Sequence, residues 1–148
     1  MKIIATRTFS KIYGLAGLRI GYGFSDPALA GLLNSVRPPF NTSTVAQSAA
    51  IAALKDDAWV ARSRMVNSLG REQLREGFER LGLSSFGEQG NFVLFSLENA
   101  EQIFHSLQEM DVIVRPLAGY GLKNYLRVTI GTEAQNERFL EALGKLLK

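Results

Sequence analysis

Four glycines fall within residues 14–23, close to the start of the chain. Before them, residues 2–6 form a short apolar run with β-branched side chains, which predicts a buried strand. After them, residues 18–24 alternate between large apolar side chains and arginine or glycine, which predicts a second strand. The glycine-rich segment is therefore expected to be a loop between two strands, where the backbone can pass close to a bound group.

Lys11 lies in this loop, preceded by the hydroxyl residues Thr8 and Ser10 and followed eight residues later by Arg19. A lysine amine becomes a nucleophile when desolvation or a neighbouring cation lowers its pKa. Hydroxyl groups and an arginine are suitable partners for a phosphate dianion. The alternative is a solvated surface lysine, since the segment matches neither a Walker A loop nor a complete dinucleotide fingerprint. The apolar neighbours expected to shield Lys11 from water are Phe9, Ile12, Leu15 and Leu18.

Capping residues and the spacing of apolar side chains predict five helices and three further strands beyond the loop. Gly82 is expected to end the longest helix, and Thr132 to Gln135 form a capping box for the last one. Trp59, Phe78 and Phe139 are expected in the core, as is the apolar side of the last helix (Leu140, Leu143, Leu146 and Leu147). The predicted helices run from residues 25–27 to about 36, after residues 41–43, over 57–81, through 103–110 and from 132 to the end, and the predicted strands cover 92–97, 111–115 and 125–130.

The order of these elements indicates an α/β chain. Residues 1–56 carry two strands, which are too few for a doubly wound sheet, so this part is expected to be the end of a larger domain. Residues 57–81 are a long connecting helix, and residues 82–148 form a small β-α-β-β-α domain that is expected to fold by itself.

Composition excludes several classes of function. The chain has no cysteine, so it has neither a disulfide framework nor a thiolate metal site, and its one histidine, His105, is expected at the surface. The net charge of +3 comes from basic residues spread along the chain, whereas nucleic-acid binding needs a concentrated basic face. No run of about 18 apolar residues exists. We therefore expect a cytoplasmic protein that binds no metal, nucleic acid or membrane.

The most specific motif lies in residues 8–22, which read Thr-Phe-Ser-Lys-Ile-Tyr-Gly-Leu-Ala-Gly-Leu-Arg-Ile-Gly-Tyr. This segment closely resembles the cofactor-lysine signature of class I and II aminotransferases, which are fold-type I enzymes dependent on pyridoxal phosphate. The histidinol-phosphate aminotransferase subfamily is similar almost letter for letter. The Pro-Phe-Asn segment at 39–41, the long helix and the closing Arg-x-Thr-x-Gly at 127–131 follow in the family's order. The resemblance therefore covers essentially all 148 residues.

The resemblance implies roles for individual residues. Lys11 would be the Schiff-base lysine of pyridoxal phosphate, and Thr8, Ser10 and Arg19 would hold the cofactor phosphate. Arg127 would clamp the anionic group of the substrate, with Arg115 as a second candidate. The alternative for Arg127 is a structural arginine on a strand. Residues expected near the same pocket are Asn91 and Tyr120, while Asn41 would reach the cofactor or the dimer interface, or else cap a helix.

The resemblance implies a homodimeric transaminase that uses a small-molecule amino donor and a 2-oxo acid, with histidinol phosphate and 2-oxoglutarate as the preferred pair in histidine biosynthesis. An aromatic amino-acid aminotransferase and a phosphothreonine decarboxylase are the alternatives within the family. A non-catalytic α/β module that binds an anion or a partner chain is the alternative from another class. The family's aspartate at the pyridine nitrogen and its glycine-rich phosphate turn lie upstream of the lysine, so we expect this chain to be a truncated piece that is inactive, or nearly so, alone.

Overall fold

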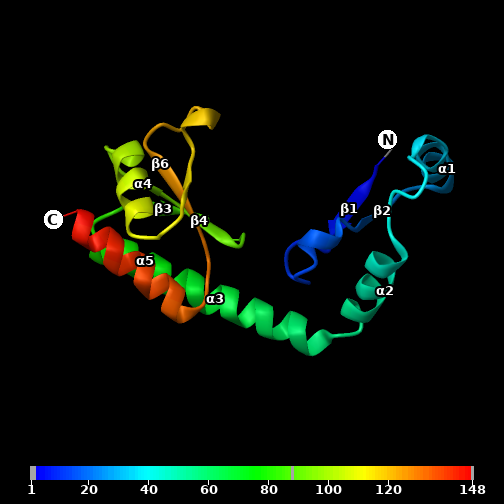
Figure 1. Cartoon of the computed structure of the whole chain (residues 1–148), viewed down its shortest axis with the longest axis horizontal. Coiled ribbons are helices and arrows are strands. Elements are labelled where there is room, and N and C mark those ends of the chain that lie inside the picture. Colours follow the sequence, from blue (N-terminus) through cyan, green and yellow to red (C-terminus); the bar gives the residue numbers. More distant parts are fainter. Residues whose placement is uncertain (1–2, 88, 148) are drawn as a thin grey trace. The chain divides into compact units, whose positions relative to one another are not determined.

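The computed structural model describes residues 3–87 and 89–147 (Figure 1). The chain divides into two compact units, residues 1–64 and residues 65–148. The division falls within helix α3 (Asp57–Arg80), which confirms the predicted long helix to within one residue. Among the described residues, no helix is both long enough and apolar enough to cross a membrane.

The first unit begins with an antiparallel pair of strands, β1 (Ala5–Thr8) and β2 (Gly21–Phe24). Both predicted strands were placed too early. Residue 2 of the first lies outside the described residues, and the start of the second is instead the 3-10 turn η1 (Ala16–Leu18). The prediction that the first strand is buried was also wrong, because every residue of β1 is exposed in this unit.

Two helices follow in the first unit, and both start at predicted capping residues. The side chain of Asp26 accepts a hydrogen bond from the backbone of Leu29 at 3.0 Å and begins α1 (Pro27–Val36). Ser43 does the same for the backbone of Ala46 at 3.1 Å and begins α2 (Thr44–Ala53). Each cap pairs a backbone N–H group that has no partner inside the helix, which is why these residues set the helix starts.

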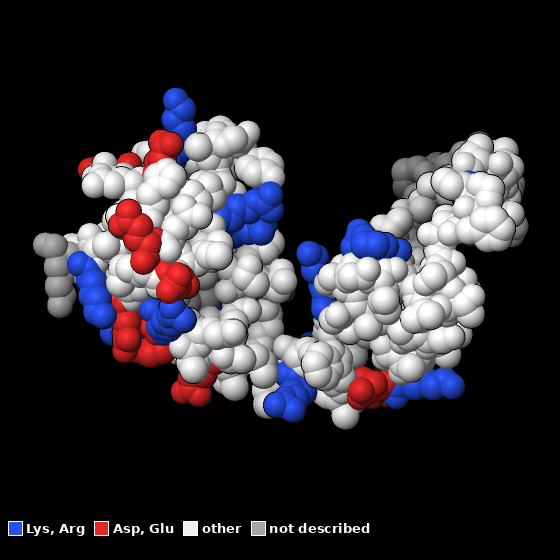
Figure 2. All heavy atoms as spheres, viewed as in Figure 1, with Lys and Arg blue, Asp and Glu red and all other residues white. Residues whose placement is uncertain are grey.

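Little of the first unit is buried. Its described residues include three buried apolar side chains, Phe9, Ala46 and Ala50, whereas Phe40 is 98% exposed and Val36 is 77% exposed. Figure 2 shows the corresponding surface as mostly uncharged. This unit therefore presents apolar side chains that nothing in the described chain covers.

The second unit contains a four-stranded antiparallel sheet with the order β3-β4-β6-β5. Side chains alternate along its two central strands, so Val93, Phe95, Leu126 and Val128 are buried while their neighbours are only partly covered. The short strand β3 was not predicted, and the strand predicted over residues 111–115 is reduced to β5. The elements are β3 (Ser85–Phe86), β4 (Phe92–Ser96), α4 (Ala100–Glu109), β5 (Arg115–Pro116), β6 (Tyr125–Thr129) and α5 (Glu133–Leu146).

Three phenylalanines form the centre of the second core. The ring of Phe78 on α3 stacks on Phe95 with centroids 4.7 Å apart, and Phe139 on α5 meets both rings edge-on. The predictions for Phe78 and Phe139 are confirmed. Trp59 is 48% exposed and Leu147 is 38% exposed, so their placement in the core was wrong. Both residues keep the helical spacing of core positions, but in the described chain no second layer covers them.

The second core also needs the last turns of α3, because Leu74 and Phe78 are fully buried in it. The helix then ends in the predicted glycine cap. Gly82 has a φ of +69°, and the backbone of Leu83 donates to the carbonyl of Phe78 at 2.9 Å. A piece beginning at residue 82 would lack two core side chains, so the expectation that residues 82–148 fold alone does not fit this core.

Helices α3 and α5 approach closely at two glycines of α3. A Cβ atom on Gly77 would lie 2.4 Å from the side chain of Leu140, and one on Gly70 would lie 2.7 Å from Asn136. Asn136 is 2% exposed and fully hydrogen-bonded. Its amide donates to Gln73 at 2.9 Å and its carbonyl oxygen accepts from the backbone of Gly131 at 2.9 Å. The amide therefore joins α3, α5 and the segment that follows β6.

We predict that Asn136→Ala destabilises the chain by about 1–3 kcal/mol, because the Gly131 N–H group and the Gln73 side chain lose their buried partner. The matched control is Asn99→Ala, since Asn99 is exposed and its side chain makes no capping bond. Urea unfolding followed by circular dichroism measures both variants. Equal midpoints for the two variants would contradict this role of Asn136.

Candidate functional site

The lysine loop, residues 9–20, joins β1 to β2 and folds around Phe9. The ring of Phe9 is 3% exposed and lies 5.0 Å from the ring of Tyr13 and 5.6 Å from that of Tyr22. Within the loop, the backbone of Gly14 donates to the carbonyl of Lys11 at 2.9 Å, and that of Leu15 donates to Phe9 at 2.9 Å. The loop thus has its own small core and a defined backbone path.

Lys11 is exposed in the described chain. We expected its apolar neighbours to shield it, and this expectation is not met. Phe9 is buried and Ile12, Leu15 and Leu18 are half-buried, while Lys11 between them stays exposed. Any shielding of the Lys11 amine must therefore come from groups other than these neighbours.

Thr8, Ser10 and Arg19 come together at one end of the lysine loop, and their role in holding a cofactor phosphate stays a prediction. The hydroxyl of Thr8 accepts from the backbone of Ser10 at 3.0 Å. The guanidinium of Arg19 lies 3.5 Å from the Ser10 hydroxyl and donates to the carbonyl of Ala16 at 2.7 Å. Two hydroxyls and a permanent cation at one place make a donor set that suits an anion.

The backbone of Arg19 is left-handed, with a φ of 51°. This conformation costs a residue with a side chain roughly 1–2 kcal/mol, and glycine would adopt it freely. Strain of this kind gathers at functional sites, where the surrounding structure maintains it. The position therefore carries an arginine although the backbone favours glycine.

A second group of predicted residues lies in the second unit. Arg115 on β5 is the register partner of Arg127 on β6, so the two side chains share one face of the sheet. This face is the one opposite the buried core, because Leu126 and Val128 point to the core. In residues 3–87 and 89–147 neither arginine forms an ion pair. Like charges placed directly opposite are destabilising unless a ligand of opposite charge lies between them.

The guanidinium of Arg127 stacks on an aromatic ring. Its guanidinium carbon lies 4.7 Å from the centroid of the Phe92 ring on β4. Its Nε atom is buried, and among the described residues no hydrogen-bond partner lies within reach of it. A planar cation that is fixed on one face and keeps unused donors is arranged to bind a carboxylate or a phosphate.

The segment before β4 is tied to α3 by two side chains that the sequence did not suggest. Asn67 and Arg71 both donate to the carbonyl of Gly90, at 3.2 and 2.8 Å. The carbonyl of the next residue, Asn91, accepts from the backbone of Ile130 at 3.0 Å, while the Asn91 side chain is exposed. These bonds fix the start of β4, and with it Phe92 under Arg127. The signal that was missed is a polar pair four residues apart on a helix face otherwise directed at the core.

Other predicted site residues are not brought to these two places. Tyr120 is 69% exposed in the turn η2 (Ala118–Tyr120). His105, which was expected at the surface and not in a site, is exposed on α4. Asn41 accepts from Arg37 at 3.2 Å, and Ser43 caps α2, so the cap alternative for Asn41 is wrong.

The shifted pKa values also lie elsewhere, on the exposed face of α3. A hydrogen bond from Arg75 holds the pKa of Glu72 below its usual value, and the same bond raises the pKa of Arg75.

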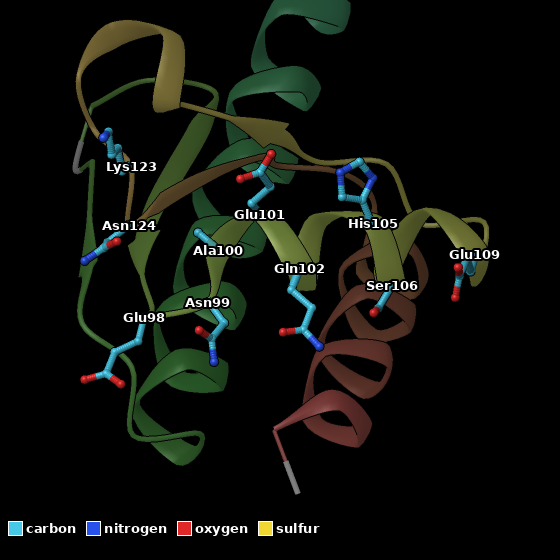
Figure 3. A pocket seen from close by; sticks show the side chains of 10 residues that line it. All are labelled: Glu98, Asn99, Ala100, Glu101, Gln102, His105, Ser106, Glu109, Lys123 and Asn124. Carbon is cyan, nitrogen blue, oxygen red and sulfur yellow. The ribbon is translucent and has the colours of Figure 1, made fainter.

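A hollow of about 710 Å³ lies at the start of α4 and contains none of the predicted site residues. In Figure 3, the side chains of Glu98, Asn99 and Gln102 spread apart instead of meeting at a point. This hollow therefore has no arrangement that would hold a ligand.

Comparison with known proteins gives one consistent family. Residues 1–143 match the family described as Aminotransferase class I and II. The chain is 51% identical over 146 residues to a histidinol-phosphate aminotransferase of Methylobacillus flagellatus, covering 99% of this chain and 40% of that protein. It is 53% identical over 146 residues to histidinol-phosphate aminotransferase 2 of Pseudomonas fluorescens, covering 98% and 40%. The chain thus spans about 40% of the length of the curated relatives that it matches.

Solved structures agree with the sequence relatives. The histidinol-phosphate aminotransferase from Clostridium acetobutylicum superposes with a TM-score of 0.91 at 29% identity, over 97% of this chain and 45% of that one. The enzyme from Sinorhizobium meliloti, solved in complex with pyridoxal-5'-phosphate, gives 0.85 at 27% identity, over 97% and 40%.

The strain at Arg19 predicts a difference between two substitutions. Arg19→Gly should be more stable than Arg19→Ala by about 1 kcal/mol, because both lose the guanidinium while only glycine relieves the left-handed backbone. Thermal and urea unfolding of the two variants measure the difference. An alanine variant as stable as the glycine variant would show that Arg19 is not strained.

Proposed function

The chain belongs to the aminotransferase class I and II family. On that premise we propose that it is part of a pyridoxal-phosphate-dependent transaminase that acts on histidinol phosphate and 2-oxoglutarate. Identities near 50% to histidinol-phosphate aminotransferases over the whole chain support this substrate pair. The observation that carries the proposal is the cross-strand pair of Arg115 and Arg127, which suits substrates with two negative charges.

The residues at one end of the lysine loop fit the phosphate of the cofactor. Arg19 supplies a charged donor, Ser10 supplies a hydroxyl 3.5 Å from it, and Thr8 orders the backbone of Ser10. In the described residues no carboxylate pairs with Arg19 to compete for its charge. The site therefore has the donors that a phosphate dianion needs, and it has them next to Lys11.

Pyridoxal phosphate, when bound, supplies an aldehyde that joins amines and a ring that accepts electrons. Lys11 Nζ would attach the cofactor through that aldehyde. The same nitrogen, once released, would carry the proton between the substrate Cα atom and the cofactor C4′ atom. Both tasks need the amine within reach of the aldehyde carbon of a cofactor whose phosphate Arg19 holds, and the loop between positions 11 and 19 sets that separation.

Arg127 would bind the anionic group of the substrate, and Arg115 would add the second positive charge. Histidinol phosphate carries a phosphate dianion, and 2-oxoglutarate carries two carboxylates. The substrate of each half-reaction therefore has two negative charges for the arginine pair to bind. The Phe92 ring beneath Arg127 lowers the freedom of its guanidinium, so less conformational entropy is lost on binding. Asn91, which follows the Gly90 carbonyl that Asn67 and Arg71 hold, stays a further candidate for contact with the substrate.

The alternatives are less well supported. An aromatic amino-acid substrate does not explain a second arginine facing the first. The likeness to an L-threonine-O-3-phosphate decarboxylase is at 23% identity and bears on the fold alone. A non-catalytic module that binds an anion would use the same donor set, but it gives no role to the lysine beside that set. A homodimer and a cytoplasmic location stay predictions, and the exposed apolar side chains of the first unit support the first of them.

Borohydride trapping tests the role of Lys11. With micromolar pyridoxal phosphate, we expect labelling of Lys11 to exceed that of the exposed Lys55 by about tenfold, because one charge-assisted contact with the phosphate is worth about that factor. Peptide mass spectrometry measures the label at each lysine. Arg19→Ala should lower labelling at Lys11 to the level at Lys55. Equal labelling of both lysines in the unaltered chain would remove the assignment.

Titration with inorganic phosphate tests the arginine pair. The Arg127 Nε–H resonance should shift in the unaltered chain and in Arg62→Ala, an exposed control, but much less in Arg115→Ala. Without phosphate, Arg115→Ala should stabilise the chain by about 0.2–1 kcal/mol, because it removes the repulsion between the two strands. An unchanged phosphate response in Arg115→Ala would contradict the dianion site.

A further inference from the structure

A tryptophan on the first turn of α3 reaches the lysine loop. Trp59 Nε1 donates to the backbone carbonyl of Ile12 at 2.8 Å, across 47 residues of sequence. Ile12 is the residue that follows Lys11. We propose that Trp59 is a positioning residue that holds the lysine loop so that the Lys11 amine points to the anion site, an inference that rests on the proposed function.

The rest of the indole also contacts the loop. A Cβ atom built on Gly14 would lie 3.8 Å from Trp59 Cζ2, so the indole is in van der Waals range of this glycine. Gly14 has a φ of +71°, a conformation that glycine adopts without strain. The indole therefore lies beside the turn after Lys11, and its N–H group donates to the carbonyl of Ile12.

Trp59 is itself fixed at the start of its helix. The side chain of Asp56 accepts from the backbone N–H of Trp59 at 2.9 Å, which is the geometry of a helix cap. The indole therefore extends from a backbone position that the cap defines. A rigid point of attachment is what a positioning residue requires.

The other hydrogen bonds of the loop are local. Lys11 is followed by a turn in which Gly14 donates to its carbonyl, and Leu15 donates to Phe9. Among the described residues, the bond from Trp59 is the one hydrogen bond that joins the lysine loop to a helix. The peptide groups on the C-terminal side of Lys11 are then held at two carbonyls, which directs the base of the lysine side chain.

A role in packing alone is the competing explanation, and the N–H group separates the two. The chain has one tryptophan, so growth of a tryptophan auxotroph on 3-benzothienylalanine replaces position 59 and no other. This analogue keeps the ring shape and puts sulfur where the N–H group was. 5-Fluorotryptophan keeps the N–H group and is the matched control.

Two measurements report the effect of removing the N–H group. Hydrogen exchange at the Gly14 and Leu15 amides reports the loop without any cofactor. The ratio of pyridoxal-phosphate labelling at Lys11 to that at Lys55 reports the direction of the amine. Loss of the N–H group should speed exchange at these two amides by about five- to tenfold, the factor of one ordinary hydrogen bond, and leave β1 and β2 unchanged. It should also lower the labelling ratio by a similar factor, and 5-fluorotryptophan should restore both values.

The outcomes are distinct. Unchanged exchange at Gly14 and Leu15 overturns the inference, as does faster exchange with an unchanged labelling ratio, or faster exchange spread equally over β1 and β2. If the unaltered chain shows no preference for Lys11 over Lys55, the proposed function fails. Hydrogen exchange then still decides whether Trp59 holds the loop.

Discussion

The close approach of α3 and α5 at Gly70 and Gly77 determines the geometry of the second unit. At these points α3 contributes no side chain, so the amide of Asn136 on α5 can bond to α3 and to the segment after β6. That segment fixes where β6 ends, and the register of β6 in turn sets Arg127 opposite Arg115 and over Phe92. One amide in the core thus connects the contact between the two helices to the strand that carries Arg127.

Part of this structure could be predicted from the sequence, because local chemistry decides it. Helix starts at Asp26, Ser43 and Thr132, and the glycine cap at residue 82, each depend on one side chain pairing with nearby backbone. The motif around Lys11 is local for the same reason. Burial could not be predicted in this way. Trp59 keeps the spacing of a core residue, but spacing does not say whether another layer of protein covers that face.

The cross-strand features depend on register, which sequence patterns do not fix. Both arginines were proposed as substrate ligands, yet nothing in the sequence places Arg115 opposite Arg127 and not beside another residue of β6. The bonds from Asn67 and Arg71 to Gly90 likewise need the three-dimensional path of the segment before β4. The net charge also differs between the two units, although the basic residues are spread along the sequence. Residues 1–64 hold eight Lys and Arg against three Asp and Glu, while residues 65–148 hold nine against eleven. The basic excess therefore lies in the unit that carries Lys11.

The indole bound to the lysine loop has an optical consequence. Since Trp59 is the single tryptophan, the intrinsic fluorescence excited at the red edge of protein absorption comes from this one indole, which contacts the lysine loop. Its emission will respond to water entering the loop, and energy transfer will quench it when a chromophore absorbing in the near ultraviolet settles beside residue 11. The chain thus contains its own spectroscopic probe, located at the residue where covalent chemistry is expected to start.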